Sequence, residues 1–259
     1  MKKNLKIFKI GGGIIDDTSA LKNFLYEFSK IKEAKILVHG GGRMVNIQLE
    51  KLGIPTQMIN GRRITDFETL QVAVQFYAGL INKNIVAQLQ KNNCNAIGLS
   101  GADGNAIISV KRPITEIDFG YVGDIKKKSI NQKFIKLLVS NNYTPIFSAI
   151  THDGNGNLFN TNADTIAAKL AIALSRKFET ELHYCFERQG VLLDVNDEKS
   201  ILQNIKYEYY QELLEQKIIF DGMIPKLDNA FRVLKKGVKK VVLEHPENIN
   251  NEIKTVLEL

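Results

Sequence analysis

The 259-residue sequence has only two cysteines, Cys94 and Cys185, and four scattered histidines. Two thiols cannot form the network of disulfides that stabilises small secreted domains, and these two do not have the spacing of metal ligands. No histidine lies near a cysteine or carboxylate at a spacing typical of a zinc site. We therefore expect both cysteines to be small apolar side chains in or near the core.

The sequence also lacks an apolar run long enough to span a bilayer. The N-terminal stretch, residues 1–13, is basic, but its apolar part is too short and too interrupted for a signal peptide. We find no low-complexity linker and no repeat of short period. Together these features predict a cytoplasmic protein.

Positive charge is in excess, with a net charge of +7 and an isoelectric point of about 9.2. A nucleic-acid-binding protein would concentrate its basic residues on one face and interleave them with aromatic side chains. Here the basic runs, residues 126–128, 235–236 and 239–240, are short and fall on expected turns or helix ends. We interpret them as solvated surface, and a modest positive field would also attract a polyanionic small molecule.

Apolar segments of strand length alternate with amphipathic segments of helix length. This alternation is typical of an α/β fold with an open, mainly parallel central sheet sandwiched between helices. A turn at residues 175–180 predicts two lobes that share the sheet, residues 1–178 and 179–259. Strands are expected at residues 4–10, 34–40, 95–99, 143–150, 180–187 and 238–244, a hairpin at 106–127, and helices at 19–31, 41–53, 63–90, 131–141, 162–175, 206–217 and 224–237.

Two of the helix starts carry capping residues. Thr65 and Glu68 have the Thr-x-x-Glu spacing of a capping box at the start of the long helix. Asn162 is suited to cap the helix that follows it. These caps predict where the two helices begin.

Glycine turns follow the first two expected strands. "KIGGG" places Lys9 before Gly11 and Gly12, and "VHGGG" ends in Gly41 and Gly42. Neither stretch is a Walker A loop or a Gly-x-Gly-x-x-Gly motif. Backbone N–H groups in such turns can approach an anion closely, and ligands of open parallel sheets bind beyond the carboxyl ends of the strands. Two such turns predict a shared phosphate or carboxylate pocket.

An alternative interpretation of His-Gly-Gly-Gly is the oxyanion hole of an esterase. That interpretation requires a Gly-x-Ser-x-Gly elbow, whereas the nearest match, residues 98–102, ends in Ala102. Arg63 fits an anion pocket better, because its guanidinium can bind a carboxylate through two parallel hydrogen bonds. Its neighbour Arg62 is interpreted as a surface residue.

The sequence resembles the N-acetylglutamate kinases of the amino acid kinase family from about residue 6 to residue 243. The stretches that carry the resemblance occur in the same order and at similar spacing. They are "KIGGG", "VHGGG", "GRRITD", "GLSGADG", "YVGDI", "NTNADTIAAKLA" and "DGMIPK".

This resemblance implies transfer of the γ-phosphoryl group of ATP to the γ-carboxylate of N-acetyl-L-glutamate, giving an acyl phosphate in arginine biosynthesis. It also implies Mg²⁺ carried on the ATP phosphates, rather than a metal held by the protein. Asp164 would position two catalytic lysines, Lys9 and Lys226. The other implied site residues are Gly11 and Gly12 for phosphate, Gly41, Gly42, Arg63 and Asn160 for the acyl-glutamate, and Glu187, Arg188, Gln189, Gly190, Val191, Leu192, Ile218, Ile219 and Phe220 for ATP.

The lobes inherit roles from the same resemblance: residues 1–178 would bind the acyl-glutamate and form the dimer, and residues 179–259 would bind ATP. The sequence starts almost directly with its first strand and lacks the additional N-terminal helix of hexameric, arginine-inhibited relatives. We therefore expect a homodimer without arginine feedback, which binds neither nucleic acid nor membrane.

The chain departs from the family in its nucleotide segment, which reads "CFERQGV" instead of a sequence such as "TDVPGV". Glu187 replaces the usual aspartate, and Arg188 and Gln189 replace small or apolar residues. Several alternatives stay open at this point. They are N-succinyl-L-glutamate as the substrate, a different acceptor such as carbamate, aspartate or a nucleoside monophosphate, and a nucleotide-binding regulator without catalytic activity.

Overall fold

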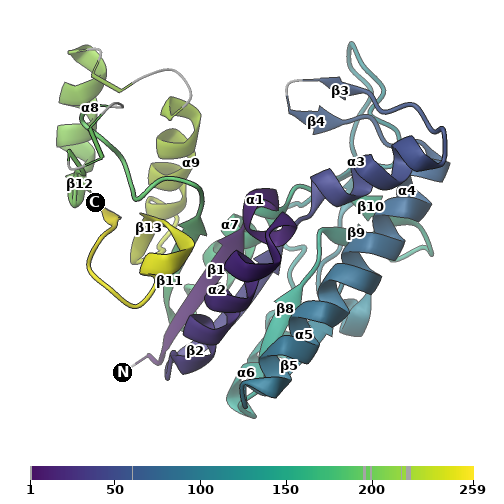
Figure 1. Ribbon diagram of the computed structural model, residues 1–259, viewed down its shortest axis with the longest axis horizontal. Helices are drawn as coiled ribbons and strands as arrows, with labels where there is room; N and C mark the ends of the chain where they lie inside the picture. The colour runs from purple at the N-terminus through teal and green to yellow at the C-terminus, as the bar shows by residue number, and fades with distance from the viewer. Residues whose placement is uncertain (1, 60, 195–196, 199, 217, 220–222) are drawn as a thin grey trace.

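The computed structural model describes residues 2–59, 61–194, 197–198, 200–216, 218–219 and 223–259. In this part of the chain, eight strands form one central sheet in the order β12-β14-β13-β11-β1-β2-β8-β5 (Figure 1). Their bounds are β1 Asn4–Ile10, β2 Ala34–His39, β5 Ala96–Leu99, β8 Thr144–Phe147, β11 Glu179–Cys185, β12 Asn204–Lys206, β13 Lys240–Glu244 and β14 Thr255–Glu258. Neighbouring strands are parallel except β13 and β14. The predicted open, mainly parallel sheet is confirmed.

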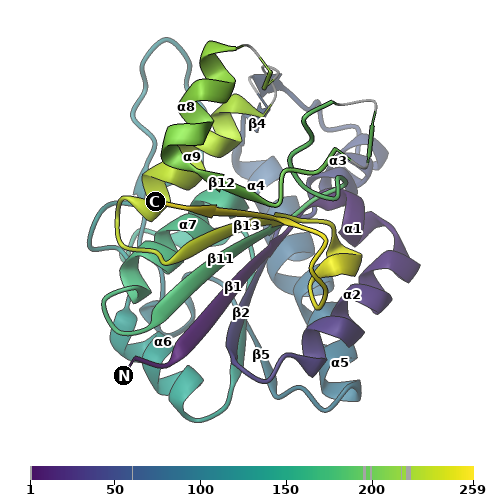
Figure 2. The same ribbon diagram turned by 90° about the vertical axis from the view of Figure 1, so that its left-hand side faces the viewer.

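Helices cover both faces of this sheet, as predicted. Figure 2 shows α7, α8 and α9 on one side of the strands and α1, α2 and α5 on the other. Parallel strands are buried on both faces by such crossover helices, which explains their nearly continuous apolar sequences. The helices are α1 Gly12–Asp16, α2 Thr18–Lys30, α3 Gly42–Lys51, α4 Phe67–Val74, α5 Asn82–Lys91, α6 Gln132–Ser140, α7 Ala163–Leu174, α8 Tyr207–Glu215 and α9 Ile224–Leu234.

The core is organised around the central strand β1. Phe8 of β1 lies edge-on to Phe28 of α2 and stacks on the imidazole of His183 in β11, with ring centroids 5.3 and 4.3 Å apart. All three side chains are buried. Cys94 and Cys185 are buried and free, as expected from their apolar character. Lys9 lies near the carboxyl end of β1 and is one of two lysines in this otherwise largely apolar strand.

The long helix expected at residues 63–90 begins later and changes pitch midway. A π-helical segment, Gln75–Ile81, separates α4 from α5. Asp66 rather than Thr65 caps α4, because its carboxylate accepts from the Thr69 N–H at 2.8 Å. The predicted capping box is therefore wrong: Thr65 is buried and bridges to Gly120 in a neighbouring segment. Tertiary pairing overrides the local capping signal here.

Three two-stranded sheets lie outside the central one. The predicted hairpin is confirmed by antiparallel β6 and β7, and Asn162 caps α7 as predicted by accepting from Thr165 N–H. The strand expected to be last, β13, is followed by β14, which was not expected and pairs antiparallel with β13 at the end of the chain. The small sheets pair β3 Met58–Ile59 with β4 Arg62–Arg63, β6 Val110–Lys111 with β7 Gly123–Asp124, and β9 Ile150–His152 with β10 Leu158–Asn160.

Within the described ranges, no helix has the length and apolar character required to cross a membrane. The division into lobes at residue 178 falls in the turn between α7 and β11. That division stays a prediction.

Candidate active site

The two glycine turns lie side by side at the carboxyl ends of adjacent strands. β1 and β2 are parallel, and Ile10 is in register with His39. Gly11 follows β1 and precedes α1, while Gly41 follows β2 and precedes α3. Both turns therefore direct free backbone N–H groups to the same edge of the sheet, where an anion can bind.

Gly41 adopts a conformation that disfavours any other residue. Its φ angle is +130°, and a Cβ atom at this position would overlap Ile81 Cδ1. Ile81 is the last residue of the π-helical segment and is buried. Close packing between this segment and the turn thus explains why glycine is required at the start of α3.

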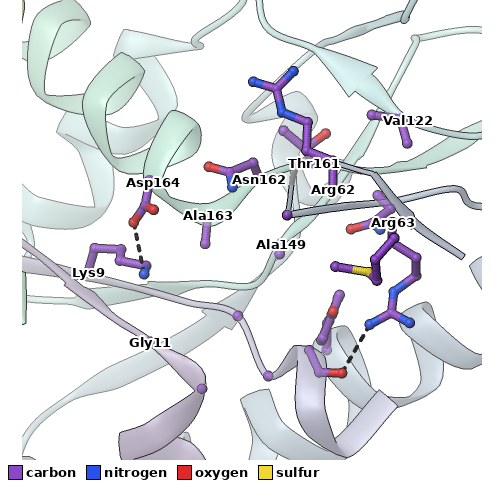
Figure 3. A pocket seen from close by; sticks show the side chains of 18 of the residues that line it. Lys9, Gly11, Arg62, Arg63, Val122, Ala149, Thr161, Asn162, Ala163 and Asp164 are labelled. Carbon is purple, nitrogen blue, oxygen red and sulfur yellow. Dashed lines mark hydrogen bonds and ion pairs between the residues drawn. The ribbon is translucent and has the colours of Figure 1, made fainter. Parts of the chain in front are cut away.

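Lys9 and Asp164 meet above this edge (Figure 3). Lys9 Nζ lies 2.8 Å from Asp164 Oδ1, and the Lys9 side chain is only 17% exposed. Asp164 belongs to the first turn of α7, where a carboxylate is also favoured by the helix dipole. The pair thus joins two segments that are far apart in the sequence and holds the ammonium group next to the glycine turns.

Arg63 places a buried guanidinium near the same glycine turns, beside Gly42. Arg63 Nη2 donates to the Gly42 carbonyl at 3.0 Å, while its buried Nη1 has no hydrogen-bond partner in the described part of the chain. Tyr77, from the π-helical segment, lies beside it, and burial raises the pKa of this phenol so that it stays protonated. The free Nη1 donor is suited to bind a carboxylate.

Eight predicted site residues share one hollow. Lys9, Gly11, Gly12, Gly41, Gly42, Arg63, Asn160 and Asp164 all line it. Asn160 ends β10, and its amide donates to Thr65 Oγ1 at 3.1 Å, which fixes its side chain at the wall. Sequence analysis missed Met58, Arg62, Tyr77, Arg112, Val122, Ala149 and Thr161, which line the same hollow.

The missed residues had weak or misleading signals. Arg62 was interpreted as a surface residue; it is exposed, yet it lines this hollow and the next one. Val122 stands in the quoted "YVGDI" stretch, but Arg112 and Tyr77 belong to no motif. Arg112 reaches the wall because β6 pairs with β7, where its guanidinium forms an ion pair with Asp124 at 2.7 Å.

Lys226 completes a second hollow that adjoins the first. Lys9, Asp164 and Lys226 all line it, so the convergence expected of these three side chains is present. Asp164 contacts only one of the two lysines: the ion pairs of the described residues include Lys9–Asp164 but not Lys226–Asp164. Instead, the ammonium group of Lys226 lies 4.8 Å from the centre of the Phe186 ring.

The predicted nucleotide residues divide into two groups. Glu187 and Arg188 line a third hollow together with Gly11, Gly12 and Lys226. Gln189, Gly190 and Val191 instead join the end of the chain: Gln189 accepts from the Asn248 amide, Gly190 packs on Thr255, and the Val191 N–H donates to Thr255 Oγ1. Leu192 bridges to Ile201, Ile218 is half-buried and Ile219 is buried, and none of these described residues lines the three hollows. Phe220 lies outside the described residues.

All three hollows are lined in part by Lys9, and their walls are rich in cations. The other cationic residues that line one or more of them are Arg62, Arg63, Arg112, Arg188 and Lys226. The carboxylates in the walls are Asp164, which is paired with Lys9, and Glu187. This arrangement favours one anionic ligand beside Arg63 and a second, more highly charged one between Lys9 and Lys226.

Fold and site together define a class of protein. The model of the Amino acid kinase family matches residues 4–245, and the chain belongs to this family. Its relatives include the "Acetylglutamate kinase" of Cytophaga hutchinsonii, to which it is 50% identical over 258 residues, 98% of this chain and 97% of the relative. It is 48% identical to the protein of that name from Phocaeicola vulgatus, with 99% of both chains covered. The protein of that name from Methanopyrus kandleri is 34% identical over 95% of this chain and 96% of the relative.

Solved structures share the fold at lower identity. N-acetylglutamate synthase from Neisseria gonorrhoeae, complexed with coenzyme A and N-acetyl-glutamate, superposes with a TM-score of 0.81 at 19% identity. The match covers 99% of this chain and 59% of that one. Carbamate kinase from Giardia lamblia bound to AMP-PNP gives a TM-score of 0.68 at 13% identity, with 99% and 98% of the two chains covered. At these identities the likeness shows the fold alone.

Proposed function

We propose that this chain is an acetylglutamate kinase. It transfers the γ-phosphoryl group of ATP to the γ-carboxylate of N-acetyl-L-glutamate, a step of arginine biosynthesis. The observation that carries the proposal is the shared position of Lys9, Asp164 and Lys226 around one hollow, next to the hollow that holds Arg63 and the glycine turns. Identity of 45–50% with proteins named acetylglutamate kinase supports the same substrate.

The chemistry explains why no general base is required. A glutamate γ-carboxylate has a pKa of about 4.3, so it is already ionised at neutral pH. The difficulty is to bring this anion to a triphosphate of high negative charge. Positioning and positive charge therefore supply the catalysis, as is general for phosphoryl transfer.

Each site residue then has a role. Arg63, with its unpartnered Nη1, and Asn160 bind the acyl-glutamate together with Gly41 and Gly42. Lys9 acts on the attacking side with the N–H groups of the Gly11–Gly12 turn. Lys226 acts on the leaving side, and Asp164 holds Lys9 in place through their ion pair. Asp164 takes no proton in this scheme.

The nucleotide is assigned to the hollow lined by Glu187, Arg188 and Lys226. ATP contacts of Gln189, Gly190, Val191, Leu192, Ile218, Ile219 and Phe220 stay a prediction. Mg²⁺ bound to the ATP phosphates would neutralise part of their charge. Within the described residues, no group of three or more His, Cys, Asp or Glu side chains could hold a metal ion.

The lobes divide these tasks at residue 178. Every residue that lines the Arg63 hollow lies between Lys9 and Asp164, which supports acyl-glutamate binding by residues 1–178. The nucleotide hollow lies between the lobes: Phe186, Glu187, Arg188, Met223 and Lys226 support ATP binding by residues 179–259, while Lys9 and residues 11–14 form the opposite wall. We further expect a cytoplasmic homodimer without arginine feedback; a hexamer in sedimentation velocity would contradict this.

The test is a paired assay of ADP release with N-acetyl-L-glutamate and N-succinyl-L-glutamate. We expect turnover with the acetyl substrate and trapping of the acyl phosphate by hydroxylamine as a hydroxamate. Turnover with the succinyl substrate alone would transfer the assignment to that alternative. ATP binding without turnover of either would favour a non-catalytic regulator, and a reaction without enzyme serves as the blank.

A further inference from the structure

Phe186 is the residue in the unusual "CFERQGV" segment that contacts a proposed catalytic side chain. It follows β11 directly, and its backbone N–H donates to the Glu244 carbonyl at 3.1 Å, which ties it to the end of β13. Its half-buried ring forms part of the wall of both hollows that Lys226 lines. The backbone thus holds the ring at the boundary between these two hollows.

The Lys226 ammonium group lies over this ring, 4.8 Å from its centre. This distance is within the range of a cation–π interaction, in which the negative face of an aromatic ring attracts a cation. A carboxylate would bind the ammonium group more strongly, but Asp164, which lines one hollow with Lys226, pairs with Lys9. Glu187, which lines the other, forms no ion pair with Lys226 among the described residues. Among the contacts of the described residues, the Phe186 ring is the partner found for this ammonium group.

Lys226 needs such a partner because its side chain is long and exposed. A lysine side chain has many rotamers, so holding its ammonium group in one place costs conformational entropy. Pro225 directs the first turn of α9, but it constrains the backbone and not the ammonium group. An aromatic platform can restrict the side chain while leaving all three N–H donors free for phosphate oxygens.

We propose that Phe186 is a positioning residue that holds the Lys226 ammonium group where the β-phosphate of the nucleotide binds. The inference rests on the role proposed above for Lys226. It assigns a function to a residue of the segment "CFERQGV", whose neighbours Glu187, Arg188 and Gln189 depart from the family pattern. A polar residue without an aromatic ring at this position would remove the cation–π contact of the Lys226 ammonium group.

The test compares binding of ADP and AMP by titration calorimetry, because the difference between them reports the contribution of the β-phosphate. Four variants are needed: Phe186→Leu, Phe186→Tyr, Lys226→Met and the double variant Phe186→Leu/Lys226→Met. Leucine keeps the apolar volume and removes the ring face, whereas tyrosine keeps the face. Tyr26→Leu is the matched control, since Lys30 lies 4.0 Å from the Tyr26 ring on an exposed part of α2.

We expect Phe186→Leu to weaken ADP binding about fivefold, the fold-change that an exposed cation–π contact represents, without changing AMP binding. Phe186→Tyr should restore ADP binding to within about twofold. In the Lys226→Met background the leucine substitution should have no further effect, because the ring then has no cation to hold. Thermal unfolding and the Tyr26→Leu control should be unchanged.

Equal weakening of AMP and ADP would overturn the inference and assign the ring to the base or sugar. Additive losses in the double variant, failure of tyrosine to rescue, or an unchanged ADP-to-AMP ratio in Lys226→Met would overturn it too. Neither nucleotide requires a phosphoryl acceptor. If wild-type protein binds ADP but phosphorylates no acyl-glutamate, the proposed function fails while this experiment still decides the role of Phe186.

Discussion

Lys9 Nζ and Asp164 Oδ1 lie 2.8 Å apart, which links the end of the central strand β1 to the first turn of α7. Most surface ion pairs contribute little, because water screens both charges. Here the lysine is largely buried beside two glycine turns, while the carboxylate is half exposed. The pair therefore fixes the direction of one ammonium group rather than the stability of the fold.

Removal of the Asp164 charge should reduce turnover and spare folding. We expect Asp164→Asn to lower kcat about 100-fold, comparable to the loss of one preorganised group that stabilises transition-state charge. Unfolding free energy should change by less than about 1 kcal/mol, as for an exposed pair. Glu33→Gln is the matched control: it breaks the Lys6–Glu33 pair, also 2.8 Å, on the same strand. A kcat within threefold of wild type would remove Asp164 from the site.

The geometry of the Arg63 guanidinium should matter beyond its charge. Arg63→Lys keeps the charge but loses the planar fork, in which Nη2 donates to the Gly42 carbonyl and Nη1 has no hydrogen-bond partner among the described residues. We expect KM for the acyl-glutamate to rise at least about tenfold, with KM for ATP unchanged. Arg43→Lys, at an exposed position next to Gly42, serves as the control. A parallel rise of both KM values would contradict the assignment.

Gly41 should tolerate no side chain. Its Cβ would overlap Ile81 Cδ1, so Gly41→Ala should cost about 2–3 kcal/mol of unfolding free energy as overpacking and also weaken acyl-glutamate binding. Gly53→Ala is the control. Its φ of +69° is also left-handed, but no atom lies within 4 Å, so only about 1 kcal/mol of backbone strain is expected. Equal costs in chemical denaturation would show that packing against Ile81 is unimportant.

His39 should make the protein less stable in acid. Burial lowers its pKa to about 4, and the neutral ring bridges the Gly40 carbonyl and the Asn82 amide. Since the folded-state pKa is below the usual 6.5, the unfolded chain binds the proton more readily, and stability falls as pH falls from 6.5 toward 4. The loss from pH 7 to pH 5 is about 2 kcal/mol. His39→Gln should remove this part of the slope in urea titrations; an unchanged slope would refute it.

His183 should have the opposite effect. Burial by itself would lower its pKa, but Glu244, 2.7 Å from its Nδ1, and Glu181, 3.5 Å from its Nε2, together raise it. Lys254 is also close to this cluster, with its Nζ 3.9 Å from Glu244 Oε2. With the folded-state pKa raised, the contribution of His183 is complete below pH 6.5 and is lost as pH rises through the folded value. His183→Gln should flatten the alkaline side of the stability profile, and an unchanged alkaline slope would contradict this.

Much of the fold follows from local pattern. Alternation of apolar strands and amphipathic helices predicted the parallel sheet and its cover, and the glycines after β1 and β2 predicted where anions would bind. These features are readable because they depend on neighbours within a few residues. The capping box at Thr65 was predicted wrongly because the conformation there does not depend on near neighbours. It depends on pairing with Gly120, which lies far along the chain.

From the sequence by itself, the glycine turns and Arg63 predict an anion site, and the family resemblance implies Lys9, Asp164 and Lys226 as its catalytic residues. Only the tertiary structure decided their partners. It pairs Asp164 with Lys9, seats Lys226 over Phe186 and brings Tyr77 and Arg112 into the Arg63 hollow. Distances between side chains on different elements depend on how the helices pack on the sheet, and no spacing along the chain encodes that packing.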